Sequence, residues 1–258
     1  MEQNLSKKTR TESDLIGSRE VPESALYGVQ TLRGIENFRI SKFHLNEYPL
    51  FIQALAITKM GATIANRELD LLTEEQADAI LRACKEILEG KHHEQFPVDM
   101  IQGGAGTTTN MNINEVVANR ALELMGHQRG EYQYCSPNDH VNRSQSTNDA
   151  YPTAIHIGLY YTHLKLVKHF EVLIEAFRKK GSEFAHIIKM GRTQLEDAVP
   201  MTLGQTFNGF ASILEHEVKN LDFAAQDFLT VNMGATAIGT GITAEPEYAE
   251  KCIAALRK

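Results

Sequence analysis

Two long stretches of helical periodicity constrain this sequence more than any other feature. The first runs from about Asp149 to Lys189 and the second from about Pro200 to Met233, with apolar residues at steps of three and four in both. Periodic runs longer than about 25 residues are typical of helical bundles and coiled coils rather than of ordinary globular helices. The sequence therefore predicts a mainly α-helical protein that is built around long helices.

The apolar surface of the first long run is wider than one partner helix can cover. Ile157, Leu164, Val167 and Ile174 lie off its main apolar stripe, so more than one face of this helix must be buried. We expect other subunits, or chain outside these residues, to complete the bundle. Strands do not alternate with the long runs, so a doubly wound α/β fold is disfavoured.

Shorter elements precede the long runs. Loops with a short strand or hairpin are expected up to about Phe43, and a helical period begins after Pro49. Thr73 and Gln76 have the spacing of a capping box and predict the start of a further helix, and another is predicted from about Met111 to Met125. This change of pattern predicts an N-terminal domain over residues 1–146 and the start of a central long-helix domain over residues 147–258.

Charge and cysteine content exclude several classes of protein. The chain has 26 Lys and Arg against 33 Asp and Glu, a net charge of −7, so neither nucleic acid nor an anionic membrane surface is an expected partner. Its three cysteines lie far apart without a C-x-x-C pair, which supports neither a zinc knuckle nor a disulfide framework. No apolar run approaches the ~20 residues of a spanning helix, and the first residues lack the apolar core of a secretory signal. We therefore expect a cytoplasmic protein.

Three polar segments lie beside predicted helix starts. The first, Gln102–Asn112, combines glycines with three threonines, and the second, Ser144–Asp149, places Ser146, Thr147 and Asn148 in a row. The third, Gly191–Asp197, lies between the two long helices. Each has a plain structural alternative: a glycine-rich turn, an N-cap and a polar turn, respectively. Together they supply hydroxyl and amide donors with little fixed charge, which suits a small carboxylate better than a metal or a nucleotide.

Metal and dinucleotide sites are disfavoured. His156 and His163 lie seven residues apart, without an accompanying carboxylate or a partner four residues away, so a packing or surface role is favoured over metal binding. The segment Gly239–Ala244 matches G-x-G-x-x-A but follows a predicted helix instead of a strand.

The three polar segments resemble those of the aspartase/fumarase superfamily, in particular of its ammonia-eliminating branch. The matching stretches are GGAGTTTNMNINEVVANRALE from Gly103, SQSTNDAYPT from Ser144, GRTQLEDAVPMTLGQ from Gly191 and NMGATAIGTG from Asn232. The resemblance implies a three-domain helical subunit, a homotetramer whose active sites combine segments of three subunits, and a lyase that eliminates ammonia from L-aspartate to give fumarate. It implies no organic cofactor and no metal ligand set, and it leaves activation by a divalent cation open.

Site roles follow from the resemblance, residue by residue. Thr107, Ser146 and Thr147 would bind the substrate carboxylate next to the carbon that loses its proton, where charge builds up in an aci-carboxylate intermediate. Asn148 would contact the leaving amino group, and Thr193 would bind the other carboxylate.

Gln194 distinguishes between members of the superfamily. Fumarases and several other members have His at this position, whereas glutamine has no accessible pKa and can only form hydrogen bonds. Together with Thr147, where fumarases typically have a second Ser, it favours elimination of an amine. Ser136 replaces the His of a secondary anion site of fumarases, so that site is not expected here.

The resemblance also implies a general-base serine in a loop of the form GSSxMPxKxNP, which this sequence does not contain. We expect this serine beyond Lys258, where the sequence ends within a helical pattern that carries no stop signal. The chain is therefore expected to be an N-terminal portion that is inactive by itself. Two alternatives remain open: a class II fumarate hydratase, and a non-catalytic helical assembly module.

Overall fold

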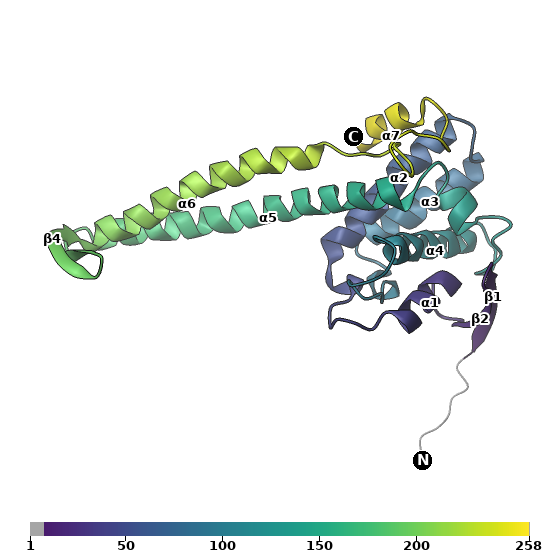
Figure 1. Ribbon diagram of the computed structural model, residues 1–258, viewed down its shortest axis with the longest axis horizontal. Helices are drawn as coiled ribbons and strands as arrows, with labels where there is room; N and C mark the ends of the chain where they lie inside the picture. The colour runs from purple at the N-terminus through teal and green to yellow at the C-terminus, as the bar shows by residue number, and fades with distance from the viewer. Residues whose placement is uncertain (1–7, 258) are drawn as a thin grey trace, which may run out of the picture. The chain divides into compact units, whose positions relative to one another are not determined.

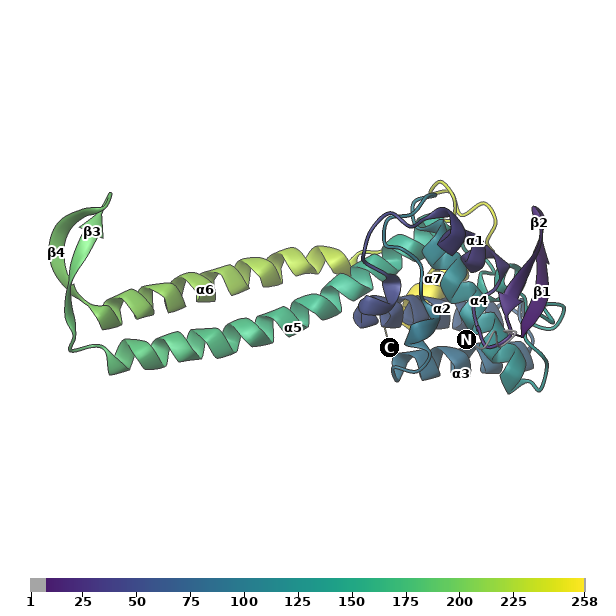
Figure 2. The ribbon, with the colours of Figure 1, turned by 90° about the horizontal axis from the view of Figure 1, so that it is seen from below.

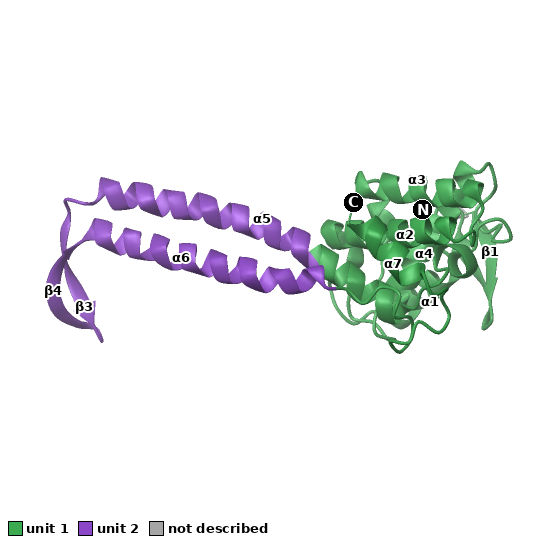
Figure 3. Ribbon diagram, turned by 90° about the horizontal axis from the view of Figure 1, so that it is seen from above, with its two compact units in different colours: residues 1–158, 231–258 green, residues 159–230 purple. Residues whose placement is uncertain are grey.

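The computed structural model describes residues 8–257. The chain forms two compact units: unit 1 comprises residues 1–158 and 231–258, and unit 2 comprises residues 159–230 (Figure 3). The domain boundary expected at residues 146 and 147 coincides with the start of a helix and stays a prediction.

Two expectations concern the ends of the chain, outside the described residues. The expectation of no secretory signal depends partly on the first seven residues. The expected position of the general-base serine is counted from Lys258, which also lies outside the described part. The structure tests neither expectation, and both stay predictions.

Helices dominate the described chain (Figure 1). The α-helices are α1 (Val29–Asn37), α2 (Pro49–Glu68), α3 (Glu74–Leu88), α4 (Thr107–Leu124), α5 (Thr147–Glu183), α6 (Leu203–Ala225) and α7 (Tyr248–Leu256). The strands are β1 (Thr9–Asp14), β2 (Gly17–Pro22), β3 (Ile188–Thr193) and β4 (Glu196–Thr202). Short turns of helix lie at Leu45–Glu47, His93–Gln95, Pro137–Val141 and Gln226–Leu229.

The core of unit 1 lies between α2, α3 and α4. Buried apolar side chains from all three helices form one cluster, among them Leu55, Ile80 and Val116. The α3 start is the predicted capping box: Gln76 N donates to Thr73 Oγ1 and Thr73 N donates to Gln76 Oε1, both at 3.2 Å. This box satisfies N–H groups that a helix start leaves without partners, so the prediction is confirmed.

The sequence predicted one of two elements at the N-terminal end of unit 1 and missed the other. The expected N-terminal hairpin is confirmed, because β1 and β2 pair as antiparallel strands. Helix α1 was not predicted from the sequence. Its first turn depends on a distant side chain, since the carboxylate of Glu115 on α4 accepts from the N–H groups of Gly28, Gln30 and Thr31 at 2.8, 2.8 and 3.0 Å.

Unit 2 contains most of α5, the β3–β4 hairpin and α6. Long helices are confirmed, but three of their predicted ends are wrong. Lys189 and Pro200 both lie in the hairpin, and Met233 lies beyond α6, which ends at Ala225. Pro200 pairs with Met190 instead of opening a helix, and α6 begins at a capping box between Thr202 and Gln205. Both hairpin strands contain apolar residues, among them Ile188, Met190 and Val199, so an interpretation by helical periodicity extends the helices too far.

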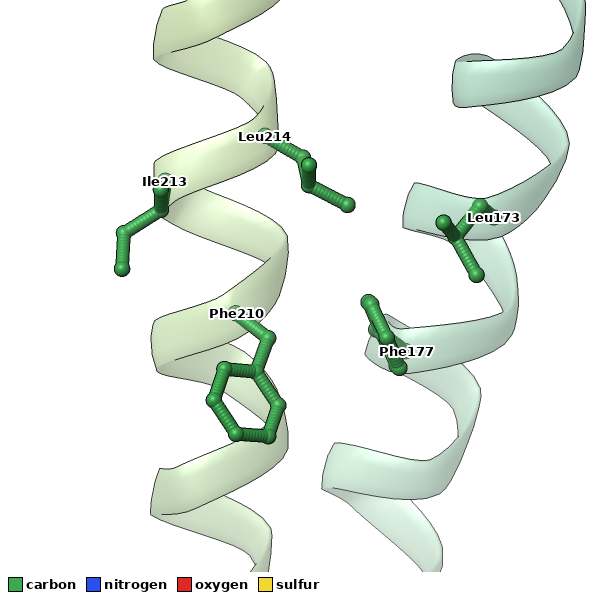
Figure 4. A pocket seen from close by; sticks show the side chains of 5 residues that line it. All are labelled: Leu173, Phe177, Phe210, Ile213 and Leu214. Carbon is green, nitrogen blue, oxygen red and sulfur yellow. The ribbon is translucent and has the colours of Figure 1, made fainter.

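Helices α5 and α6 lie side by side in unit 2 (Figure 2). Apolar side chains on both helices are exposed. Figure 4 shows the groove between them, of about 370 Å³, which is lined by Leu173, Phe177, Phe210, Ile213 and Leu214. Val172 and Phe223 are 69% and 83% exposed. Exposed apolar side chains along both helices agree with the expectation of further subunits, which stays a prediction.

Within residues 8–257, no helix combines the length and apolar character needed to cross a membrane.

Candidate active site

The first turns of α4 and α5 meet in unit 1. Asn110 Nδ2 donates to Thr147 Oγ1 at 3.2 Å, which joins the two helices directly. Gly106, the residue before α4, has φ of +94°, and a Cβ atom there would overlap the ring of Tyr151. Only glycine permits this approach. The structure thus brings Thr107, at the start of α4, together with the polar segment that begins α5.

The loop before α4 is shaped by backbone that favours glycine. Gly104, Ala105 and Gly106 have φ of +74°, +47° and +94° in succession. Thr107 is exposed, and its hydroxyl donates to the carbonyl of Gly104 at 2.5 Å. A carboxylate that binds this hydroxyl would therefore replace the Gly104 carbonyl as its acceptor.

Ser146 is the N-cap of α5, the plain structural role that the sequence offered for this segment. Its Oγ accepts from Asn148 N at 3.2 Å, and its own N–H donates to Asp149 Oδ1 at 2.9 Å. The other oxygen of Asp149 accepts from the N–H groups of Gly234 and Thr236 at 3.2 and 2.8 Å. Asp149 is fully buried. This carboxylate therefore fixes the loop before α7 against the segment that contains Ser146, Thr147 and Asn148.

Asn148 is held by that same loop. Its Nδ2 donates to the carbonyl of Ala237 at 2.8 Å, and its main-chain carbonyl accepts from Asn232 Nδ2 at 3.0 Å. The carbonyl is available because Pro152, four residues later in α5, has no N–H. The stretch from Asn232 thus contacts the start of α5, although the two are about eighty residues apart in sequence.

A buried lysine contacts the residues beside this site, and the sequence analysis did not identify it. Lys59 Nζ on α2 donates to Asn110 Oδ1, Asn142 Oδ1 and Gln145 Oε1 at 2.8, 3.0 and 2.8 Å. Burial lowers its pKa to about 7, and nearby Asp149 partly opposes that shift. The sequence held one signal of this site, because Lys59 lies one turn after Leu55 on the apolar stripe of α2.

Thr193 and Gln194 belong to unit 2 and lie at the tip of the β3–β4 hairpin. Both are exposed. Gln194 and Leu195 have φ of +50° and +72°, as in the type I′ turns that usually require Asn or Gly. The segment read as a polar inter-helix turn is therefore a strand hairpin whose tip presents these side chains to solvent. Thr193 and Gln194 thus belong to unit 2, whereas Thr107, Ser146, Thr147 and Asn148 belong to unit 1.

The structure shows the surroundings of His163 and Ser136, which belong to a metal site and an anion site that the sequence disfavoured. His163 Nε2 lies 2.9 Å from Asp222 Oδ1, so this histidine pairs across α5 and α6. Among residues 8–257, no three His, Cys, Asp or Glu side chains are grouped to hold a metal ion. Ser136 caps a turn of helix, with its Oγ accepting from Asn138 N and Asp139 N.

Comparisons with known proteins identify relatives of the chain. Residues 17–258 match a family described as lyase. The aspartate ammonia-lyase of Pseudomonas canavaninivorans is 58% identical over 240 residues, which cover 93% of this chain and 51% of that protein. A structure of fumarate lyase:delta crystallin from Brucella melitensis has a TM-score of 0.92 and 50% identity, over 96% of this chain and 54% of that one. Class II fumarase from Schistosoma mansoni has a TM-score of 0.90 and 35% identity, over 96% and 52% of the two chains.

The chain spans about half the length of the relatives it matches. The family match covers all three polar segments, and the mainly α-helical fold expected from the sequence is confirmed. The chain therefore belongs to this lyase family, that is, to the aspartase/fumarase superfamily that its polar segments resemble.

Proposed function

We propose that the protein containing this chain eliminates ammonia reversibly from L-aspartate to give fumarate. One observation carries the proposal: the starts of α4 and α5 meet through the hydrogen bond from Asn110 to Thr147, with Thr107 and Asn148 beside them. Each helix start carries roughly half a positive charge, which favours a bound carboxylate. The identity to an aspartate ammonia-lyase supports aspartate as the substrate.

The proposed chemistry removes a proton from the carbon next to one substrate carboxylate. The electron pair of that C–H bond first moves onto the carboxylate, as an aci-carboxylate, and then forms the new C=C bond. The C–N bond breaks and its electron pair leaves with the nitrogen. Thr107, Ser146 and Thr147 would stabilise the charge on the carboxylate, and one such donor is typically worth ~10²–10³ in rate.

The remaining substrate groups are assigned to other residues. Asn148 would contact the amino group, and Thr193 would bind the second carboxylate. Gln194 would hold the substrate by hydrogen bonds and transfer no proton, because an amide has no accessible pKa. This assignment favours aspartate over malate and makes class II fumarase the second candidate within the superfamily.

The proposed enzyme is a homotetramer in which hairpin tips and helix starts of different copies meet. The exposed apolar side chains of α5 and α6 and the solvent-facing tip at Gln194 support it. We also propose that the general base is a serine beyond Lys258, that the reaction needs no organic cofactor, and that the enzyme works in the cytoplasm. Activation by a divalent cation is left to direct measurement.

Thr147→Val tests the proposed carboxylate site. The protein is expressed from the whole reading frame that contains this chain, and fumarate formation from L-aspartate is followed by ultraviolet absorbance. Loss of the hydroxyl is expected to lower kcat by roughly 100-fold, with a smaller change in KM. Thr58→Val is the control, because the Thr58 hydroxyl donates to the Ala54 carbonyl of its own helix. An unchanged kcat in Thr147→Val would remove this residue from the site.

A further inference from the structure

We infer that Lys59 is a positioning residue for the proposed reaction: its buried ammonium group orients Asn110 so that the Thr147 hydroxyl donates toward the substrate. The inference rests on the proposed function. Lys59 lies on α2, outside all three polar segments, and is fully buried. It would therefore act through Asn110 and Thr147 without touching the substrate.

The contacts of Lys59 match its donors one to one. An ammonium group has three N–H donors and no acceptor, and Nζ lies 2.8–3.0 Å from three amide oxygens, those of Asn110, Asn142 and Gln145. These residues come from α4 and from the segment before α5. Lys59 thus connects the polar segment at the start of α4 with the polar segment before α5.

The lysine determines which way round the Asn110 amide lies. Its oxygen accepts from Lys59, so its nitrogen must be directed elsewhere, and Nδ2 donates to Thr147 Oγ1 at 3.2 Å and to Asn142 Oδ1 at 3.1 Å. If the amide were turned over, its N–H groups would face the ammonium, which has no acceptor. In its charged form, Lys59 therefore keeps the donor end of Asn110 on Thr147.

The direction of this chain of hydrogen bonds matters for an anion. Thr147 Oγ1 accepts from Asn110, so the hydrogen of its own hydroxyl can be directed outward. A carboxylate oxygen can only accept, so a hydroxyl whose hydrogen is directed toward it is a ready donor. Donors that are oriented before the reaction stabilise developing charge without reorganising.

Charge compensation makes the arrangement tolerable inside the fold. An isolated buried ammonium is costly, and the buried carboxylate of Asp149, at the start of α5, favours the charged form of Lys59. Asp149 also accepts from the N–H of Ser146. Both buried charges thus contact the polar segment before α5, Lys59 through Gln145 and Asp149 through the N–H of Ser146.

The test compares two single variants and their combinations with Thr147→Val, in the protein from the whole reading frame. Lys59→Met removes the ammonium at similar length. Asn110→Asp keeps an acceptor for Lys59 but removes the donor to Thr147, so it tests the same connection if Lys59→Met does not fold. Each variant is expected to lower kcat for L-aspartate by roughly 100-fold with a smaller effect on KM, as for a misplaced catalytic group. Asn112→Leu is the matched control, because Asn112 is equally buried on α4 but donates to the Gln95 carbonyl at 3.0 Å.

The combinations separate positioning from a purely structural role. If Lys59 and Asn110 act through Thr147, adding Thr147→Val to either variant lowers kcat little further, since residues that act as a unit are not additive. Independent losses would multiply to roughly 10⁴-fold and would overturn the inference, as would a control with the same kcat loss. If the unsubstituted protein forms no fumarate from L-aspartate, the proposed function fails and the inference falls with it. If that activity is present and the losses multiply, the inference alone fails.

Discussion

Asn232 Nδ2 donates to the main-chain carbonyl of Asn148 at 3.0 Å and replaces the helical hydrogen bond that Pro152 cannot make. A proline inside a helix normally leaves this carbonyl without its partner. Here the replacement comes from the loop before α7, which also contacts the side chain of Asn148. The proline therefore creates an attachment point for that loop at the residue proposed to contact the substrate amino group.

Asn232→Asp tests this attachment, because it keeps the size of the side chain but removes the donor. We expect the free energy of unfolding to fall by about 1 kcal/mol, the usual net worth of one hydrogen bond. Urea unfolding is the measurement. In a Pro152→Ala background the N–H of residue 152 takes the Asn148 carbonyl, so the cost of Asn232→Asp should shrink. An equal cost in both backgrounds would contradict this account.

Gly106→Ala tests the close approach of α4 and α5. The new Cβ would overlap the Tyr151 ring, at a φ of +94°, so we expect a loss of roughly 2–3 kcal/mol from overpacking and backbone strain together. Gly90→Ala is the control, since Gly90 has a similar φ of +87° with nothing within 4 Å of the added atom. The control should lose only about 1 kcal/mol. Equal losses in the two variants would show that the contact with Tyr151 has no cost.

Glu115 makes stability depend on pH. Burial raises its pKa from 4.5 to about 7 in the folded protein, against the effect of the N–H groups that it accepts from. The folded state therefore holds this proton over a range where the unfolded state has lost it. The contribution to stability is full below about pH 4.5 and is lost as the pH rises to about 7, by an amount on the order of 3 kcal/mol.

Glu115→Gln should remove this part of the pH dependence. Thermal unfolding between pH 4.5 and 7.5 is the measurement, with Glu131→Gln as the control because Glu131 is not buried. If the variant and the parent protein show the same slope of stability against pH, the assignment to Glu115 is wrong.

Leu195→Gly should stabilise the β3–β4 hairpin. Leu195 has φ of +72° and is 94% exposed, so glycine relieves backbone strain worth about 1 kcal/mol and removes little packing. Hydrogen exchange of the β3 and β4 amides is the measurement, and protection should increase in the variant. Lower protection would mean that the Leu195 side chain holds the turn.

Elements that depend on residues close together in the sequence could be predicted, whereas elements that depend on distant residues could not. The capping box at Thr73 and the apolar periods of α5 and α6 depend on residues within a few turns, and the structure contains all three. Helix α1 depends on Glu115, more than eighty residues away, so no local pattern marked it. The β3–β4 hairpin has Gln194 and Leu195 in a turn that usually carries Asn or Gly, and the usual turn signal was therefore missing.

Part of the candidate site could be proposed from the sequence, and its role in substrate binding stays a prediction, whereas the buried lysine that contacts it could not be proposed. Thr107, Ser146, Thr147 and Asn148 stood out because they precede helical periods, and the structure brings them together at the starts of α4 and α5. Lys59 did not, because a lysine within a helix usually indicates a solvent-exposed face. Its burial depends on three amide oxygens from distant segments, and their convergence is a property of the tertiary fold.

Substrate choice tests the central claim most directly. The protein from the whole reading frame and the 258-residue chain alone are each given L-aspartate and, separately, L-malate, and fumarate is followed by its ultraviolet absorbance. The account predicts fumarate from L-aspartate and not from L-malate with the whole protein, and none from the chain alone. Activity on L-malate alone would favour class II fumarase and contradict the interpretation of Gln194. No fumarate from either substrate would contradict the proposed function and favour a lyase that eliminates a different amine.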